Sequence, residues 1–217
     1  MSQQQIDNVI SFEARQLFAR FPALARIETY WDSLRQGRTA PARAEIDPAG
    51  LDNVLEYTFI LDAIAPGVAR LRVAGNHLSD LMGMEVRGMP ITALVLPEAR
   101  EELMNALNFV FKGGRAHIMT NAPRGFGRGQ LVGGMVLLPL TDAEGRITKI
   151  IGGLQSFGKI GRDPRRLQFN DVQLIRGEMP SPTEAAEPTF EMDALPLPGE
   201  LIDGSRKLRL VVDNTPA

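Results

Sequence analysis

The stretch LRVAGNHLSDLMGMEVRGMPI, residues 71–91, changes its pattern at Gly75. The apolar run before Gly75 is typical of a β-strand. A helix-like segment, 77–82, follows and ends at Gly83, and Gly88 comes five residues later. Because glycine adopts backbone turns that other residues resist, the stretch predicts the end of a strand followed by short helices. These helices either form one wall of a ligand site or only turn a corner of the fold.

Strands and one long helix are predicted on either side of this stretch. Residues 54–64 and 69–75 fit two strands joined by the turn 65–67. The sequence PEAREELMNALNFVFKGG, from Pro97, predicts a helix with proline at its first position, glutamates near its start and glycine after its end. Three more strands follow: RAHIMTNA, QLVGGMVLLPLTD and ITKIIGGLQSF. This order predicts an α+β fold, with a five-stranded antiparallel sheet that carries the short helices and the long helix on one face.

The two ends of the chain differ from this central part. Apolar residues at helical spacing predict N-terminal helices at 6–21 and 25–36. Their apolar stripes fit two arrangements, covering the open face of the sheet or pairing with a second copy of the chain. Many prolines exclude long regular elements from the C-terminal part, although KLRLVV, 207–212, can form one late strand. We therefore divide the chain into N-terminal helices with a basic loop (1–50), a core (51–160) and a Pro-rich tail (161–217).

The composition excludes several kinds of function. The chain has 217 residues and a net charge of −2, so no overall basic field attracts nucleic acid or an anionic membrane. The absence of cysteine excludes disulfides, thiolate metal sites, cysteine nucleophiles and cysteinyl–flavin photochemistry. The sequence holds no metal-ligand spacing, phosphate loop or catalytic residue set. It has no signal-peptide pattern and no apolar run long enough to cross a membrane. We expect a cytoplasmic protein without a catalytic or metal site.

Four stretches carry a resemblance to a known family: YWDSLRQGRTAPARAEIDP, FILDAI, RLRVAGNHLSDLMGMEVRG and GGLQSFG. With the order of elements, they resemble the PAS sensory domain, and more closely the alphaproteobacterial single-PAS proteins once described only as a domain of unknown function. The stretches bracket residues 30–158. The resemblance implies a PAS fold and a non-catalytic sensory or regulatory module in bacterial signal transduction. PAS domains bind a small molecule between the sheet and the long connector helix, or bind a protein partner, often as homodimers.

The resemblance also implies a ligand cleft. Gln155 looks like the glutamine that faces the flavin in light-oxygen-voltage domains, and Ile151 and Gly153 share its face because side chains alternate along a strand. The alternative is that Gln155 points to solvent. His77, at the start of a short helix, is either a ligand contact or a structural histidine. The candidate pocket residues are His77, Leu81, Leu103, Leu107, Val110, Phe111, Ile151, Gly153 and Gln155.

The cofactor stays unknown. The connector helix, 97–112, contains no histidine, which disfavours the haem-binding mode of oxygen-sensing PAS domains. The second histidine, His117, lies on a predicted strand, and a solvated sheet face is the simpler interpretation for it.

Phe18, Trp31, Arg35 and Arg38 are the candidates for contact with a second copy or an unknown protein partner. The two arginines lie at and after the end of the helix that carries Trp31, and docking onto an acidic partner competes with plain solvation. Two other functions stay open. One is an α+β enzyme in which His77 or an acid transfers protons in the same cleft, and the other is a ligand-free scaffold with a filled core.

Overall fold

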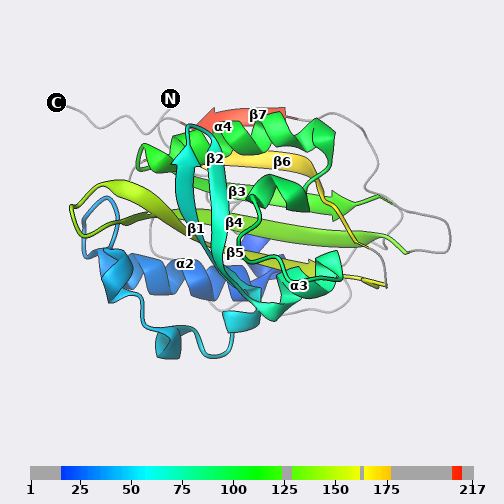
Figure 1. The fold of residues 1–217 in the computed structure, drawn as a ribbon, viewed down its shortest axis with the longest axis horizontal. Helices are drawn as coiled ribbons and strands as arrows, with labels where there is room; N and C mark the ends of the chain where they lie inside the picture. Colours follow the sequence, from blue (N-terminus) through cyan, green and yellow to red (C-terminus); the bar gives the residue numbers. More distant parts are fainter. Residues whose placement is uncertain (1–15, 124–128, 162–163, 177–206, 212–217) are drawn as a thin grey trace, which may run out of the picture.

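The computed structural model describes residues 16–123, 129–161, 164–176 and 207–211. Seven strands form one sheet in the order β2-β1-β5-β4-β3-β6-β7 (Figure 1). Neighbouring strands are antiparallel, except that β6 and β7 pair in parallel. The strands are β1 Thr58–Ala65, β2 Val68–Ala74, β3 Arg115–Ala122, β4 Leu131–Thr141, β5 Ile147–Phe157, β6 Gln168–Ile175 and β7 Lys207–Val211.

Helices occupy the N-terminal region and the connection between β2 and β3. The α-helices named in Figure 1 are α2 Pro22–Arg35, α3 Asn76–Met82 and α4 Arg100–Phe111. Short 3-10 helices accompany them: η1 Arg43–Glu45, η2 Pro48–Leu51, η3 Leu55–Tyr57, η4 Ile91–Leu94 and η5 Pro97–Ala99. The long helix is predicted to begin at Pro97. In the structure Pro97 opens the 3-10 turn η5, and the α-helix α4 begins three residues later, at Arg100, with two glutamates in its first turn.

The predicted α+β class is confirmed, and the sheet has two more strands than the five expected. β7 lies where the late strand is predicted, whereas β6 lies inside the segment interpreted as a tail. The prolines further along this segment dominate its composition and obscure the apolar residues Phe169, Val172 and Leu174, which the structure buries. The sheet therefore continues beyond the predicted core boundary at residue 160.

The stretch 71–91 folds as its glycines suggest. α3 starts after Gly75 and ends at Gly83, whose φ of 66° is left-handed, and Gly88 has a φ of 84°. The chain then returns along β2, because Leu71 donates its N–H to Met89 and accepts from the N–H of Gly88. The strand end and the short helix predicted from this stretch are confirmed.

The sheet separates two apolar cores. One core lies under α3, η4, η5 and α4 and includes Phe59, Leu107 and Leu154. The other lies under α2 and the loop that carries η2 and η3, and includes Ile27, Val136 and Ile151. In Figure 1, α4 lies in front of the strands and α2 behind them. We call these the α4 side and the α2 side.

Of the two predicted arrangements of the second N-terminal helix, the structure has the one in which α2 covers the sheet. Part of the first predicted helix lies outside the described residues.

Two pairs of adjacent glycines lie in the two middle strands. A Cβ on Gly133 of β4 would meet Thr120, and one on Gly134 would meet Phe21 and Leu24 of the α2 side. In β5, a Cβ on Gly152 would come within 2.4 Å of the Phe59 ring on the α4 side, and one on Gly153 within 2.5 Å of Ile27 on the α2 side. Each glycine pair therefore lets both cores approach the backbone closely.

No helix in the described part of the chain is long and apolar enough to cross a membrane.

Candidate functional site

Five of the predicted pocket residues meet on the α4 side. Leu81 of α3 and Leu103, Leu107 and Val110 of α4 are at most 1% exposed and belong to one core, and Phe111 packs against it. Leu103, Leu107 and Val110 recur every three or four residues, so they lie on one face of α4. The space between α4 and the sheet is filled by these side chains and by residues of β1, β4 and β5. A ligand on this side would replace or displace apolar groups.

His77 lies at the edge of this core, on α3. Its Nε2 is 2.9 Å from the hydroxyl of Ser156 on β5, and its ring meets the ring of Tyr57 edge-on, with centroids 5.0 Å apart. Burial lowers the pKa of His77 below its ordinary value, although the negative charges of Glu56 and Asp80 act in the opposite direction. These contacts give His77 a structural role that joins α3 to β5.

A second polar group lies near Ser156. The hydroxyl of Thr120 on β3 is fully buried and has no hydrogen-bond partner among the described residues. The Cβ position of Gly133 lies 2.7 Å from this hydroxyl and 3.2 Å from the Cβ of Ser156. Because a buried hydroxyl without a partner is destabilising, Thr120 gives the apolar α4 side one open hydrogen-bonding position.

The other three predicted pocket residues lie on the opposite side of the sheet. Ile151, Gly153 and Gln155 do share one face of β5, but this face packs against α2 and not against α4. The Oε1 of Gln155 accepts a hydrogen bond of 3.0 Å from the backbone N–H of Ala23. Gln155 therefore satisfies an amide in the first turn of α2, where the N–H groups lack partners within the helix. Neither a flavin-type contact nor a solvent-exposed position describes this glutamine.

A buried ionic cluster, which we call the Glu28 cluster, joins α2 to β3. One carboxylate oxygen of Glu28 is 2.6 Å from Nε2 of His117, and the other accepts a hydrogen bond of 3.3 Å from Arg115. All three side chains are at most 4% exposed. Burial alone would raise the pKa of Glu28, but His117 and Arg115 outweigh it and hold this pKa below its ordinary value.

The Glu28 cluster corrects the expectation that His117 lies on a solvated sheet face. Its imidazole is buried between α2 and the sheet, next to the ring of Phe18 at 5.1 Å. Sequence reasoning missed the cluster because Glu28 and its partners are separated by 87 and 89 residues. The local signs of it in the sequence are Arg115 and His117, which alternate with apolar residues on β3, and an acid, Glu28, among the apolar residues of α2.

The four predicted partner-contact residues are in different environments. Trp31 is buried, and its Nε1–H donates to the carbonyl of Pro139 at 2.8 Å, so it anchors α2 and is not free for a partner. Phe18 is half-buried against His117. Arg35 pairs with Asp32 on the same helix, and the exposed Arg38 pairs with Glu45 at 2.7 Å. Only Phe18 and the two arginines keep surface that a second chain could reach.

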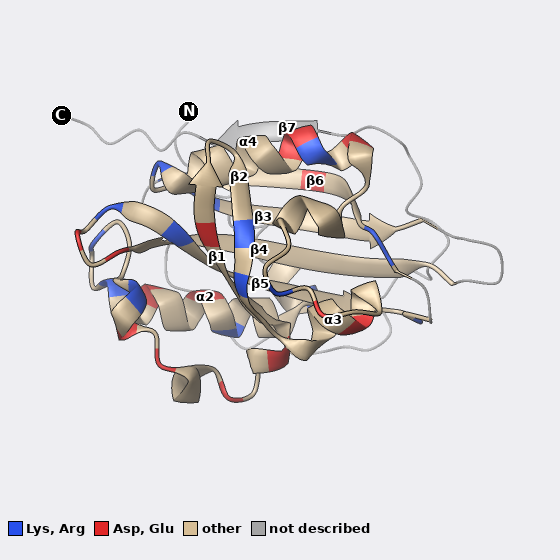
Figure 2. Cartoon of the chain, in the orientation of Figure 1, with Lys and Arg blue, Asp and Glu red and all other residues tan. Residues whose placement is uncertain are grey.

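Charge is distributed unevenly over the sheet. Figure 2 shows β4, one of the middle strands, without any charged residue, whereas charged residues lie on β1, β2 and the outer surfaces of α2 and α4. No group of three or more histidine, cysteine or acidic side chains suited to a metal ion occurs among the described residues.

Comparison with known proteins gives one family. Residues 19–155, more than half of the chain, match the family model described as PAS domain. No curated protein matches the chain.

The solved structures that match this chain share little sequence with it. The light-state LOV domain of the blue-light photoreceptor Aureochrome1 has a TM-score of 0.37 and 19% identity, over 50% of this chain and 87% of that one. An RNA-binding light-oxygen-voltage receptor gives 0.36 and 19%, over 53% and 35%. The periplasmic sensory domain of the Campylobacter jejuni chemoreceptor Tlp1 gives 0.29 and 9%, over 70% and 60%. Scores this low transfer no ligand or partner to this chain.

Proposed function

The chain belongs to the PAS domain family, and from this membership we propose that it is a sensory or regulatory module of bacterial signal transduction and not an enzyme. PAS domains are typically non-catalytic sensory domains. In this proposal the module works in the cytoplasm. It responds there to a small molecule or a protein partner and passes the response to a further protein.

The observation that carries the proposal is the sharing of β4 and β5 by two cores. Leu137 contributes to the α4 side and its neighbours Val136 and Leu138 to the α2 side. Packed interiors are dense and pass strain from one layer to the next. A change in the packing of α4 therefore moves strands on which α2 rests.

We assign the input to the α4 side. The fully buried Leu103, Leu107 and Val110 favour an apolar ligand, and the open hydroxyl of Thr120 favours one polar group on it. A ligand shifts a conformational equilibrium only by binding one state more tightly than the other. The ligand must therefore bind better to a state in which α4 has moved away from the sheet.

We assign the output to α2. Polar contacts from Gln155, His117, Arg115 and the carbonyl of Pro139 hold this helix in one position. Hydrogen-bonded networks of this kind have strict geometry and are costly when half broken. A small displacement of the strands thus changes how firmly α2 is held, and the surface around Phe18 and Arg38 changes with it. We place contact with a second copy, as a homodimer, and with the protein partner on this surface.

Native mass spectrometry of the protein purified from its own host tests the ligand part. We expect an added mass that disappears when Leu107→Trp fills the α4 side, while Met104→Gln, an exposed change on the same helix, retains it. Loss of the added mass in both variants, or in neither, contradicts the assignment to the α4 side.

Sedimentation at tens of micromolar tests the homodimer. We expect a dimer that is weakened by Arg38→Glu and unaffected by Glu101→Gln on α4. A monomer at every concentration contradicts this part of the proposal.

A separate measurement tests the enzyme alternative. Catalytic turnover by the wild type that is lost in His77→Ala would favour an enzyme.

A further inference from the structure

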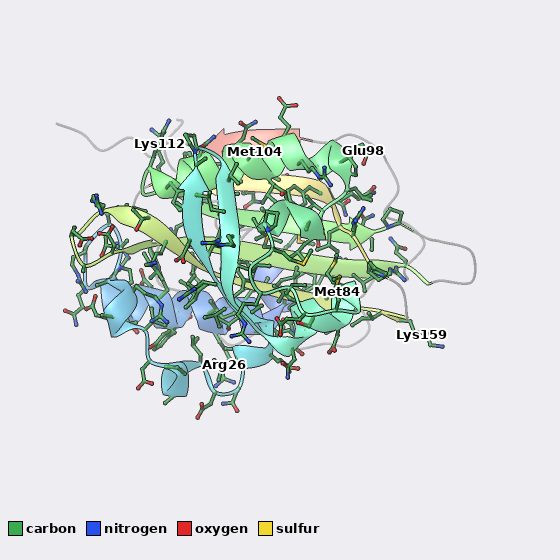
Figure 3. The ribbon with its side chains drawn as sticks, viewed as in Figure 1. Arg26, Met84, Glu98, Met104, Lys112 and Lys159 are labelled. Atoms are coloured by element: carbon green, nitrogen blue, oxygen red, sulfur yellow. The ribbon has the colours of Figure 1, made fainter. Side chains whose placement is uncertain are left out.

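A hollow of about 640 Å³ lies between α2 and the loop that carries η2 and η3. We call it the α2 groove. It opens on the surface of the molecule, on the side of α2 that faces away from the sheet, and Figure 3 places Arg26 between the helix and this loop. Its volume is in the range of small-molecule sites in proteins. The groove is separate from the α4 side, to which the proposed input is assigned.

The walls of the α2 groove are held in place. The Tyr30 hydroxyl accepts from the backbone N–H of Asp47 at 2.8 Å and donates to the carbonyl of the same residue at 3.1 Å. Its ring lies so close to Gly50 that a Cβ there would be 2.3 Å from it. Leu51 and Val54, which also line the groove, are 3% and 4% exposed and belong to the core under α2. The loop is therefore fixed to α2, and the groove exists before any ligand arrives.

Two opposite charges line this groove without meeting. Arg26 comes from α2 and Asp52 from the loop, and both are exposed. Within the described part of the chain, the side chains of Arg26 and Asp52 make no ion pair and no hydrogen bond. This differs from the nearby pairs Arg35–Asp32 and Arg38–Glu45. A cation and an anion thus face the same space, and neither has a side-chain partner among the described residues.

Neutral polar groups line the same groove. Thr29 and Ser33 follow Arg26 at three and seven residues on one side of α2, and Asn53 follows Asp52 on the loop. Ser33 donates its hydroxyl hydrogen to the carbonyl of Tyr30 and keeps its oxygen free to accept. The groove therefore offers a cation, an anion and hydrogen-bonding groups over an apolar base.

We propose that the α2 groove binds a small zwitterion of the free amino acid class. Arg26 binds the carboxylate, because a guanidinium matches the two oxygens of a carboxylate, and Asp52 binds the ammonium group. A simple anion is repelled by Asp52 and a simple cation by Arg26, so the pair selects a molecule that carries both charges. The ligand side chain lies over Leu51 and Val54.

Occupancy of the α2 groove links α2 to the loop and stabilises the folded protein by mass action. Since α2 is also the proposed output element, the ligand would act on the same helix from its outer side. This consequence rests on the proposed function, whereas the binding itself does not.

An NMR titration of the intact chain tests the binding. The probes are free amino acids with aliphatic side chains, their N-acetyl derivatives, which lack the ammonium charge, and their amides, which lack the carboxylate. We expect the free amino acids alone to shift the amide resonances of residues 25–33 and 49–54. Arg26→Gln and Asp52→Asn each weaken binding by about tenfold or more. Arg72→Gln and Glu101→Gln, which change exposed charges outside the groove, leave it unchanged.

Each other outcome overturns the proposal. Equal binding of the N-acetyl or amide derivatives shows that the two charges do not select the ligand. Even a specific site of low affinity is largely occupied at about 10 mM ligand. If no probe shifts these resonances at that concentration, the groove is not a binding site. Shifts confined to α4 and β4 place the ligand on the α4 side, which supports the proposed function while it contradicts this site.

Discussion

Glu28 is the side chain whose loss we expect to cost the most stability on α2. Its carboxylate is 2% exposed and lies between Arg115 and His117. Removal of one partner from a buried ion pair leaves the other charge without compensation. Glu28→Gln keeps the shape of the side chain, so we expect a loss of about 3 kcal/mol in the free energy of unfolding, measured by urea denaturation.

Glu45→Gln is the matched control for this change. Glu45 pairs with Arg38 at 2.7 Å, but both side chains are largely exposed. Exposed pairs contribute little to stability, and we expect no measurable effect. Equal effects of Glu28→Gln and Glu45→Gln would show that the Glu28 cluster does not stabilise the fold.

The same carboxylate gives a dependence on pH with a defined sign. Although burial opposes it, the positive partners hold the pKa of Glu28 below its ordinary value of 4.5. A lowered pKa in the folded state adds stability that is present above the unfolded pKa and is lost as the pH falls through the folded pKa. The difference in urea midpoint between the wild type and Glu28→Gln therefore narrows below pH 4.5. A difference that widens with acidification contradicts the ionised state of Glu28.

At the scale of elements, the pairing of α2 with β5 depends on Gly153. A Cβ at this position would lie 2.5 Å from Ile27 and 2.8 Å from Leu24, which are both fully buried. Overpacking a dense core costs about 1–3 kcal/mol. We expect Gly153→Ala to destabilise the protein by this amount and to speed amide hydrogen exchange in α2 more than in α4.

Two glycine variants serve as comparisons. Gly129→Ala adds a methyl group where nothing lies within 4 Å and is expected to be neutral. In Gly152→Ala the added methyl group points at Phe59 on the α4 side instead. We therefore expect this change to speed amide hydrogen exchange in α4 more than in α2. Identical patterns for Gly152→Ala and Gly153→Ala would mean that the two sides do not respond separately.

This strand also shows where sequence reasoning reaches its limit. Alternation along β5 predicts that Ile151, Gly153 and Gln155 share a face, and the structure agrees. Which helix covers that face depends on contacts distant in sequence, such as the bond between Gln155 and Ala23, 132 residues apart. Local periodicity contains no information on this choice, so the pocket predicted from the sequence combines residues from both sides of the sheet.

For the whole molecule, α2 and β6 are expected to be needed for folding. A chain limited to residues 51–160 lacks the helix that covers Val136, Leu138 and Ile151, and it lacks the strand that pairs with β3. Exposed apolar faces of this kind lead to association. We expect residues 16–176 to unfold cooperatively with heat, and residues 51–160 to aggregate or lack a cooperative transition, as measured by circular dichroism. A cooperative transition in the shorter chain would contradict this role of α2 and β6.

The overall architecture was the most predictable level. The apolar periods, the turn glycines and the helix start at Pro97 predict the order of elements and the α+β class, because these signals are local. They also predict that Leu103, Leu107 and Val110 face a core. The buried polar contacts under α2 and the α2 groove were not predicted, since each combines residues from separate parts of the chain.

The two glycine pairs in β4 and β5 have a consequence for genetics. Every glycine codon becomes an alanine codon, a valine codon, or an aspartate or glutamate codon by one nucleotide change. At these four positions each such change adds atoms toward one core only. In a selection for alleles that hold the signal permanently on or off, Gly133, Gly134, Gly152 and Gly153 are therefore expected to recur. Suppressor alleles are expected on the helix that faces the altered codon.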